Sequence, residues 1–293
     1  MTGPDSGSGT VLPDPADMTS ALQAALPQFR QVAWVAETNS TNGDLINRAR
    51  WSVDDPGQTA RPWLQGAHLQ AQGRGRAGRT WQNRVGANLM FSCAFDVFLP
   101  ARQLPTLAPL VGMVATQALR RHLADQHQSR LNMKWPNDLQ WDQAKLAGIL
   151  IESTRAGMAQ VADHHLIIIG MGLNLLDARA LSQSLNRRVA DWAGIAAQDP
   201  VAARTRACDL VASAARAWYQ ALNDVTAHGF ADLPTRYAQV DGLAGQVVDV
   251  IDNGRLRHTG VACGIDAAGQ LLLRNDRGLQ AASVGEISVR LHQ

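Results

Sequence analysis

A short run of glycines and arginines is the first feature of the sequence that could do chemistry. Residues 70–81 read QAQGRGRAGRTW and place Arg74, Arg76 and Arg79 among three glycines. Glycine lets a backbone approach a ligand closely, and arginine offers planar donors to phosphate or carboxylate oxygens. The run lacks the Lys-Ser/Thr ending of a Walker A loop, so it predicts a mobile cationic loop of another kind. A solvated surface turn and an RNA-binding, RGG-like segment are also compatible with this string alone.

Two stretches farther along carry another cation and a carboxylate. Residues 134–139 read KWPNDL, and residues 145–152 read KLAGILIE. Pro136 in a strand-like run predicts an edge or a break, which leaves Asp138 in a constrained turn where a carboxylate can ligate Mg²⁺. Lys145 precedes an apolar strand, so we expect its ammonium at the rim of a sheet, within reach of an anionic ligand. A solvated strand-end lysine and an ordinary turn aspartate are the alternatives.

A third stretch interrupts an apolar run with small and polar residues. Residues 167–175 read IIIGMGLNL and contain Gly170, Gly172 and Asn174. Glycine inside a buried strand indicates a bulge or the close approach of a ligand or a second backbone. Core packing explains the isoleucines, but it explains neither the paired glycines nor the asparagine, whose amide can orient a phosphate or a metal-bound water.

The elements that must position these stretches follow from hydrophobic periodicity and capping signals. Alternation predicts strands near residues 31–35, 67–71 and 89–97, so the arginine loop joins two strands. Further strands are expected at 131–135, 145–152 and 165–175. Helices are expected near 20–26, at Thr41 in capping-box spacing with Asp44, over 107–124, and from Asp199-Pro200 to about 223.

The order of these elements predicts an α+β fold in two parts. Residues 19–240 hold the strands and helices above, in segregated layers. From residue 241 to 293 the pattern changes to short strands around the hairpin signal Asn253-Gly254, which favours a small SH3-like β-barrel. Residues 1–18 are rich in Gly, Ser, Pro and Asp and are predicted to be a disordered leader.

Composition and charge favour a soluble globular protein. The 293 residues are 46% hydrophobic and 18% charged, enough for a substantial core, and a net charge of +2 is too small for a nucleic-acid or membrane surface. Three distant cysteines predict reduced thiols without a zinc site. The N-terminus lacks the pattern of a secretory signal, and the most apolar stretch, 166–176, is too short to span a bilayer. We therefore expect a cytoplasmic location.

Taken together, the chemistry-bearing stretches resemble the biotin–protein ligase family. The match has four parts in the family's order: ETNSTN at 37–42, GRGRAGRTW at 73–81, KWPNDL with KLAGILIE, and GMGLNL at 170–175. These motifs cover residues 32–176, and the combination of GRGRxGR with KWPND and KLAGIL is highly specific. The terminal GEISVR at 285–290 is also similar to the family's C-terminal domain.

The resemblance implies a biotin/lipoate ligase-like catalytic domain with a mixed sheet and flanking helices. It assigns contacts with biotin and its adenylate to Ser40, Thr41, Asn42, Gln70, Gly73, Arg74, Gly75, Arg76, Lys145, Gly148, Gly170 and Asn174. Lys145, Arg76 and Arg74 are the catalytic candidates, because they would offset charge that grows on phosphoryl oxygens. Nucleotide contacts are implied for Lys134, Asn137, Trp192 and Arg290, and metal binding for Asp138. For Trp192, ordinary packing is equally compatible.

The implied activity is ATP-dependent biotinylation of a lysine in a biotin carboxyl carrier protein of acetyl-CoA carboxylase or a related carboxylase. ATP with Mg²⁺ and biotin are consumed, biotinyl-5'-AMP is the intermediate, and pyrophosphate and then AMP leave. This chemistry needs no prosthetic group and no enzyme nucleophile. The sequence accordingly shows no convincing Ser-His-Asp or Cys-His arrangement, and His164 and His165 are interpreted as structural or exposed.

Two other functions are compatible with the sequence. A lipoate–protein ligase or octanoyl transferase shares the fold, and the transferase would need a cysteine nucleophile, whereas Cys93 lies in an apolar alternation. A biotin-sensing protein without transferase activity is the second. Some family members carry a winged helix-turn-helix, for which the stretch ahead of residue 31 is too short. We expect no nucleic-acid or membrane partner, and a monomer or homodimer.

Overall fold

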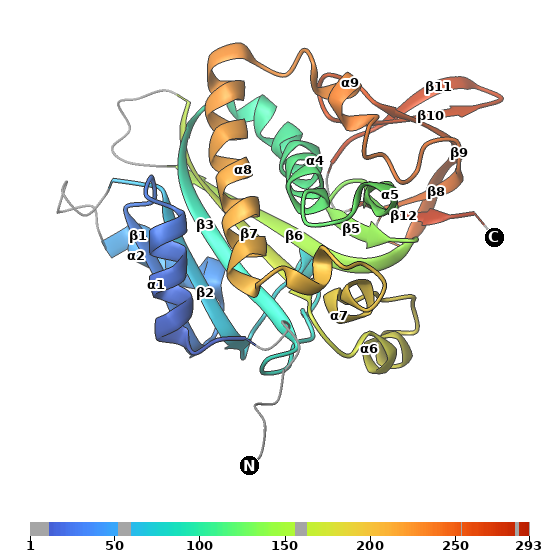
Figure 1. Ribbon diagram of the computed structural model, residues 1–293. Coiled ribbons are helices and arrows are strands. Elements are labelled where there is room, and N and C mark those ends of the chain that lie inside the picture. The colour runs from blue at the N-terminus through green and yellow to red at the C-terminus, as the bar shows by residue number, and fades with distance from the viewer. Residues whose placement is uncertain (1–11, 52–59, 156–162, 253, 285–286, 293) are drawn as a thin grey trace.

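A seven-stranded mixed sheet forms the centre of the larger part of the protein (Figure 1). The computed structural model describes residues 12–51, 60–155, 163–252, 254–284 and 287–292. The strands are β1 Gln31–Thr38, β2 Trp63–Gln70, β3 Asn88–Phe98, β4 Leu131–Lys134, β5 Asp138–Trp141, β6 Ala144–Arg155 and β7 His164–Asn174. Their order is β1-β2-β3-β7-β6-β5-β4; β1 and β2 run parallel, and all other neighbours are antiparallel. The predicted α+β class is confirmed.

Three helices cover one face of this sheet (Figure 1). They are α1 Pro15–Ala25, α4 Leu107–Arg120 and α8 Ala207–His228. On β3 the alternate residues Leu89 to Val97 point into the core beneath them. Trp218 of α8 stacks on Phe91 with ring centroids 5.5 Å apart, and its Nε1 donates to the Val111 carbonyl of α4 at 3.1 Å. Within the described residues, no helix is long and apolar enough to cross a bilayer.

The opposite face of the sheet carries the helix α2 Thr41–Trp51. Its Leu45 packs with Trp63, Ala94 and Ile168 in a small cluster of its own. Because strand residues alternate between faces, this cluster lies across the sheet from the larger core. The short elements are η2 Arg76–Gly78, η3 Ala101–Thr106, α5 Asp125–Gln128, α6 Ala178–Leu185, α7 Trp192–Ala196, η4 Ala202–Arg204 and α9 Leu233–Tyr237.

A five-stranded antiparallel sheet forms the C-terminal part, as the short strands predicted. Its strands are β8 Val247–Asp252, β9 Arg255–Ile265, β10 Leu271–Asn275, β11 Gly278–Ala282 and β12 Ile287–Leu291, in the order β11-β10-β9-β8-β12. Asp252 pairs with Arg255, as a two-residue hairpin requires, although Asn253 lies outside the described residues, as do Gly285 and Glu286. Trp135 and Thr106 of the larger part donate to the carbonyls of Gly269 and Ala268 and so attach this sheet.

Three helix starts differ from the prediction. Helix α1 begins at Pro15, inside the expected leader, because Met18 is fully buried; residues 1–11 of that leader lie outside the described residues. Helix α2 is capped by Ser40, whose Oγ accepts the Gly43 N–H at 3.3 Å, and not by Thr41. Asp199 accepts the N–H groups that begin η4, so α8 starts later, at Ala207.

Candidate active site

The candidate site lies on the α2 side of the sheet, where glycines leave a trough. Gly170 and Gly172 of β7 face the same side, and Gly148 of β6 pairs with Gly172. A Cβ at Gly170 would lie 2.3 Å from Asn42 Oδ1, and one at Gly172 would lie 2.4 Å from the indole of Trp81. The missing side chains therefore make room for α2 and for the end of the arginine loop.

A cavity of about 370 Å³ occupies this trough and brings the separate sequence motifs together. Its lining includes the predicted residues Ser40, Thr41, Asn42, Gln70, Arg74, Gly75, Arg76, Asn137, Asp138, Lys145, Gly148 and Gly170. These residues come from the start of α2 and the residue before it, the end of β2 and the loop after it, the β4–β5 turn, the start of β5, β6 and β7. The fold thus collects in one place what the sequence distributes over more than one hundred residues.

A chain of hydrogen bonds orients the polar end of the cavity. The Thr41 N–H donates to Gln70 Oε1 at 2.8 Å, and the hydroxyls of Thr41 and Ser92 lie 2.7 Å apart. The fully buried Ser92 donates to Asn42 Oδ1 at 2.5 Å, and Asn42 Nδ2 donates to Glu152 Oε2 at 2.7 Å. Linked hydrogen bonds in a low dielectric fix the direction of each donor and acceptor. This end of the cavity suits a ligand that carries both kinds of group.

Lys145 supplies a held cation at the rim. Its Nζ lies 2.5 Å from Asp138 Oδ1 and 5.8 Å from the ring centroid of Trp81, and its side chain is 15% exposed. The main-chain N–H of Lys145 donates to the Arg188 carbonyl at 3.0 Å, and its main-chain carbonyl accepts from the Ala190 N–H at 2.9 Å. Main-chain and side-chain contacts together therefore fix the ammonium beside the trough.

Side-chain contacts hold the arginine loop across the trough. Arg76 Nη1 donates to Asn137 Oδ1 at 3.1 Å, and Arg74 Nη2 donates to Glu152 Oε2 at 3.2 Å. Burial lowers the pKa of Arg76, and the charge of Asp138 opposes this shift. A guanidinium stays charged at neutral pH even so. The loop therefore brings permanent positive charge over the cavity.

A second cleft, of about 610 Å³, opens beside the first. Asp138, Lys145 and Arg187 border both spaces, and Lys134 and Arg290 line the second. Burial lowers the pKa of Lys134, and the neighbouring cations Lys145, Arg187 and Arg290 lower this pKa further. The charge of Asp138 opposes the shift. The second cleft is thus suited to an anion. The sequence analysis missed Arg187, which no motif marks.

Three predicted contacts are placed away from the cavity. Asn174 is buried, with its Nδ2 donating to the carbonyls of Lys145 and Ala190 and its Oδ1 accepting from Asn88, so it supports Lys145 from behind. Trp192 is 1% exposed and donates to a main-chain carbonyl, which agrees with core packing and leaves no ring face for adenine. Gly73 shapes the loop, because a Cβ there would lie 3.2 Å from the Trp81 carbonyl.

Besides Arg187, three residues at the site were not predicted from the sequence or received no role. Ser92 stands on the polar side of the β3 alternation, and only its pairing with Gly170 shows that it lies on the trough side of the sheet. Glu152 ends the KLAGILIE stretch and joins Asn42 to Arg74. Trp81, at the end of the loop, could have been predicted. Paired glycines in a strand leave space for a large ring, and the Trp81 indole lies against Gly172.

The predicted magnesium ligand is engaged with a cation. Asp138 Oδ1 holds Lys145, and no three His, Cys, Asp or Glu side chains cluster in the part of the chain that the structure describes. Mg²⁺ commonly uses one or two carboxylates together with substrate phosphates. Asp138 positions Lys145 in the described residues, and its binding of Mg²⁺ stays a prediction.

Comparisons with known proteins agree with this site. Residues 38–174 match the Biotin/lipoate A/B protein ligase family. The Escherichia coli (strain K12) bifunctional ligase/repressor BirA is 32% identical over 97% of this chain and 82% of its own length. The Paracoccus denitrificans biotin–[acetyl-CoA-carboxylase] ligase is 30% identical over 86% of this chain and 98% of its own.

A solved structure supports the same fold. The biotin protein ligase from Aquifex aeolicus, in complex with biotin and ATP, aligns with a TM-score of 0.70 at 22% identity, covering 90% of this chain and 100% of that one. Taken with the sequence matches along nearly the whole chain, these similarities show that the chain belongs to the biotin/lipoate A/B protein ligase family.

Proposed function

We propose that this protein uses ATP to convert biotin into biotinyl-5'-AMP and then transfers the biotinyl group to a lysine of a biotin carboxyl carrier protein. The observation that carries the proposal is the convergence of Lys145, the arginine loop and the α2 hydrogen-bond chain on one cavity. The relatives named biotin–[acetyl-CoA-carboxylase] ligase support the carrier of that carboxylase as the partner.

In the first step the ureido ring of biotin lies at the polar end of the trough, where Thr41, Asn42 and Gln70 offer donors and acceptors. The biotin carboxylate then points along the trough towards Lys145 and attacks the α-phosphorus of ATP. The new O–P bond forms as the bond to pyrophosphate breaks. Lys145, Arg76 and Arg74 offset the charge that grows on the phosphoryl oxygens.

The second cleft receives the nucleotide's phosphates. Lys134, Arg187 and Arg290 converge there beside Lys145, so the leaving pyrophosphate departs into a region of positive charge. Asn137 accepts a hydrogen bond from Arg76 at 3.1 Å, and both residues line the first cavity. Mg²⁺ enters with ATP as part of the substrate, and the chain's own residues orient and neutralise the phosphates.

In the second step the neutral amine of the carrier lysine attacks the acyl carbon of biotinyl-5'-AMP. A C–N bond forms, the acyl C–O bond breaks, AMP leaves with the electron pair, and the amine loses a proton to water. The arginine loop covers the mixed anhydride until the carrier arrives, which excludes water from a hydrolysable bond.

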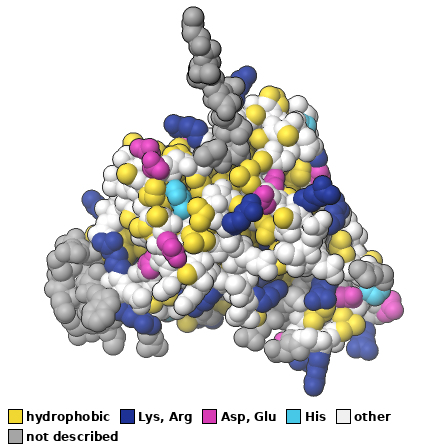
Figure 2. All heavy atoms as spheres, turned by 90° about the horizontal axis from the view of Figure 1, so that it is seen from below, with side chains coloured by type: hydrophobic (Ala, Val, Ile, Leu, Met, Phe, Trp, Pro, Cys, Tyr) yellow, Lys and Arg dark blue, Asp and Glu magenta, His cyan; other side chains and the backbone are white. Residues whose placement is uncertain are grey.

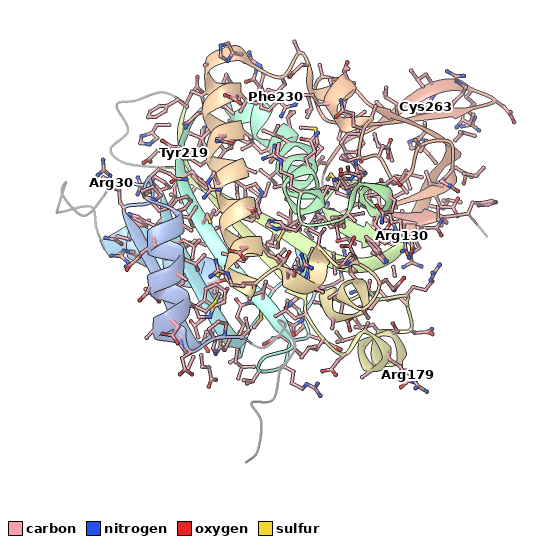
Figure 3. The ribbon with its side chains drawn as sticks, in the orientation of Figure 1. Arg30, Arg130, Arg179, Tyr219, Phe230 and Cys263 are labelled. Carbon is pink, nitrogen blue, oxygen red and sulfur yellow. The ribbon has the colours of Figure 1, made fainter. Side chains whose placement is uncertain are left out.

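An octanoyl transferase of the same fold would need a reactive thiolate. Cys93 is fully buried, and burial raises its pKa well above the ordinary value; burial also raises the pKa of Cys208. Cys263 lies in the C-terminal sheet, well away from the central sheet (Figure 3). None of the three lines the cavity, so the geometry favours an adenylate mechanism. Three free thiols also suit the reducing cytoplasm, where we infer that the reaction takes place.

The test is incubation with ATP, Mg²⁺, biotin and a purified carrier domain, followed by intact-mass measurement of the carrier. We expect one added biotinyl group, lost when the carrier's acceptor lysine is replaced by arginine. Parallel reactions with lipoate separate the ligase alternatives. Modification with lipoate in place of biotin would contradict the proposal, and tight biotinyl-5'-AMP binding without transfer would favour a biotin-sensing protein.

A further inference from the structure

The cationic residues of this sequence are almost all arginines. Of its 27 lysine and arginine residues, only Lys134 and Lys145 are lysines. Both are half-buried in the two clefts of the active site. The positive charge of the outer surface is therefore carried by arginine side chains, of which Arg30 and Arg179 are examples on the outside of the molecule (Figure 3).

An acyl-adenylate reacts readily with amines and poorly with guanidinium groups. An exposed lysine has a pKa near 10.4, so about one amine in a thousand is neutral and nucleophilic at pH 7.4. An arginine stays protonated at that pH and has no comparable lone pair to offer. A protein that makes biotinyl-5'-AMP is therefore at risk of acylating its own surface lysines, in the same C–N bond-forming step that serves the carrier.

The two lysines that remain are shielded in different ways. Lys145 Nζ is held by Asp138 at 2.5 Å, and only 15% of its side chain is exposed. Lys134 lines the second cleft among Lys145, Arg187 and Arg290, where the phosphates of ATP are proposed to lie. Because burial lowers the pKa of Lys134, a larger share of its amine is neutral, so it is the position at which self-acylation would show first.

We infer that the use of arginine in place of lysine makes the surface side chains of this ligase inert to its own acyl-adenylate, an inference that rests on the proposed function. On the face drawn in Figure 2, Lys and Arg side chains lie singly or in small groups among other side chains. Because both lysines of the chain are half-buried, the surface keeps its charge while it offers no exposed lysine amine. The surface side chains are protected in this way even against biotinyl-5'-AMP that has escaped from beneath the arginine loop.

The experiment adds one amine at the rim of the cavity. Gln183 is exposed on α6, two residues from Leu185, which lines the cavity, and it is outside the proposed catalytic and binding groups. Gln183→Lys introduces an acceptor, and Gln183→Arg introduces the same charge without one. The native protein and both variants are incubated with ATP, Mg²⁺ and biotin in the absence of carrier. Pyrophosphate release is recorded during the incubation. Biotin on lysine side chains is then located by peptide mass mapping.

We expect residue 183 of Gln183→Lys to carry at least about ten times more biotin than Lys134 or Lys145 of the native chain. Its labelling should rise about tenfold per pH unit below the amine's pKa. Labelling of a native lysine to the level of residue 183, or absence of label from Gln183→Lys, would overturn the inference. If no pyrophosphate is released, the proposed function fails instead. The N-hydroxysuccinimide ester of biotin then replaces the adenylate as the acylating reagent, and the label on residue 183 is again compared with the label on Lys134 and Lys145.

Discussion

Lys145 shows how one side chain can be prepared for chemistry by contacts that lie behind it. Asn174 donates to its main-chain carbonyl at 3.2 Å, and the segment containing Arg188 and Ala190 pairs with its main chain. Asp138 holds its ammonium at 2.5 Å. The position of the charge is thus set before a ligand binds, which is what electrostatic stabilisation of a transition state requires.

Replacement of Lys145 by methionine tests that charge directly. Lys145→Met keeps much of the side-chain length, so we expect the rate of biotin-dependent pyrophosphate release to fall by about 100- to 1,000-fold. The melting temperature should change little, because a rim lysine contributes little packing. A variant that unfolds, or that adenylates biotin at the native rate, would contradict the placement of Lys145.

The glycine trough gives a second prediction about single residues. In Gly170→Ala the new Cβ would lie 2.3 Å from Asn42 Oδ1, so Asn42 must move and its hydrogen bonds to Ser92 and Glu152 weaken. We expect biotin affinity to fall by about 1–3 kcal/mol, measured by calorimetry, because a misplaced buried amide leaves polar groups unsatisfied. Gly43→Ala is the matched control, since its Cβ would meet only Ser40, at 3.4 Å. Equal losses in the two variants would refute the role of the trough.

At the scale of elements, the arginine loop is a hairpin that reaches across the cavity. Its ends are closed by main-chain bonds between Gly73 and Trp81 at 2.8 Å and between Gly75 and Arg79 at 2.6 Å. Arg74 and Arg76 connect it to Glu152 and Asn137. A hairpin with firm ends and polar side-chain contacts across the cavity is suited to opening for substrates and closing over the intermediate.

Removal of the Arg76 side chain should therefore let the intermediate escape. In Arg76→Ala we expect release of biotinyl-5'-AMP to the solvent to rise by at least about tenfold, because a charge-assisted contact is worth more than about 1.5 kcal/mol. Filtration of radiolabelled adenylate from enzyme measures this release. Arg79→Ala removes the same charge from a side chain whose Nε donates to the loop's own Arg76 carbonyl. Similar release from both variants would show that loop charge, and not the Arg76 contact with Asn137, retains the intermediate.

Strands were predictable from sequence because the alternation of residues 89–97 is local, whereas helix starts depended on competing contacts. Asp199 was expected to cap the long helix, but its carboxylate also accepts from Ala124 and His127, and it begins η4. Thr41 was expected in a capping box, but its N–H is taken by Gln70. Such tertiary partners cannot be identified from spacing along the chain.

For the whole molecule, Gly269 fixes how the C-terminal sheet sits on the larger part. Its carbonyl accepts from Trp135 Nε1 at 3.0 Å, and its φ is +74°. A Cβ there would lie 2.8 Å from Pro109. This attachment matters for function because β12 brings Arg290 to the second cleft only while the two parts stay docked.

The substitution Gly269→Ala should loosen that docking. We expect a loss of about 1–3 kcal/mol in the free energy of unfolding, with a raised KM for ATP and an unchanged affinity for biotin. Gly264→Ala is the control, since its φ is +93° but nothing lies within 4 Å of the added Cβ, so it carries the backbone strain without the clash. Equal effects of Gly269→Ala and Gly264→Ala on the KM for ATP would rule out a role for docking of the C-terminal sheet in ATP binding.

The site as a whole was only partly predictable from the sequence. The four motifs indicated the loop, Lys145 and the α2 contacts, because each stretch carries a local signature. Ser92 pairs with Asn42, 50 positions away, and Asn42 pairs with Glu152, 110 positions away. The second cleft joins Lys134 to Arg290, which is farther still along the chain. No local pattern reports contacts of that separation.

A crystal structure with biotin and a non-hydrolysable ATP analogue tests the central claim most directly. We predict the ureido ring beside Thr41 and Asn42, the biotin carboxylate within hydrogen-bond distance of Lys145 Nζ, and the phosphates between Lys145 and Arg290. Density for both molecules at a place remote from Arg74, Arg76 and Lys145 would contradict this account.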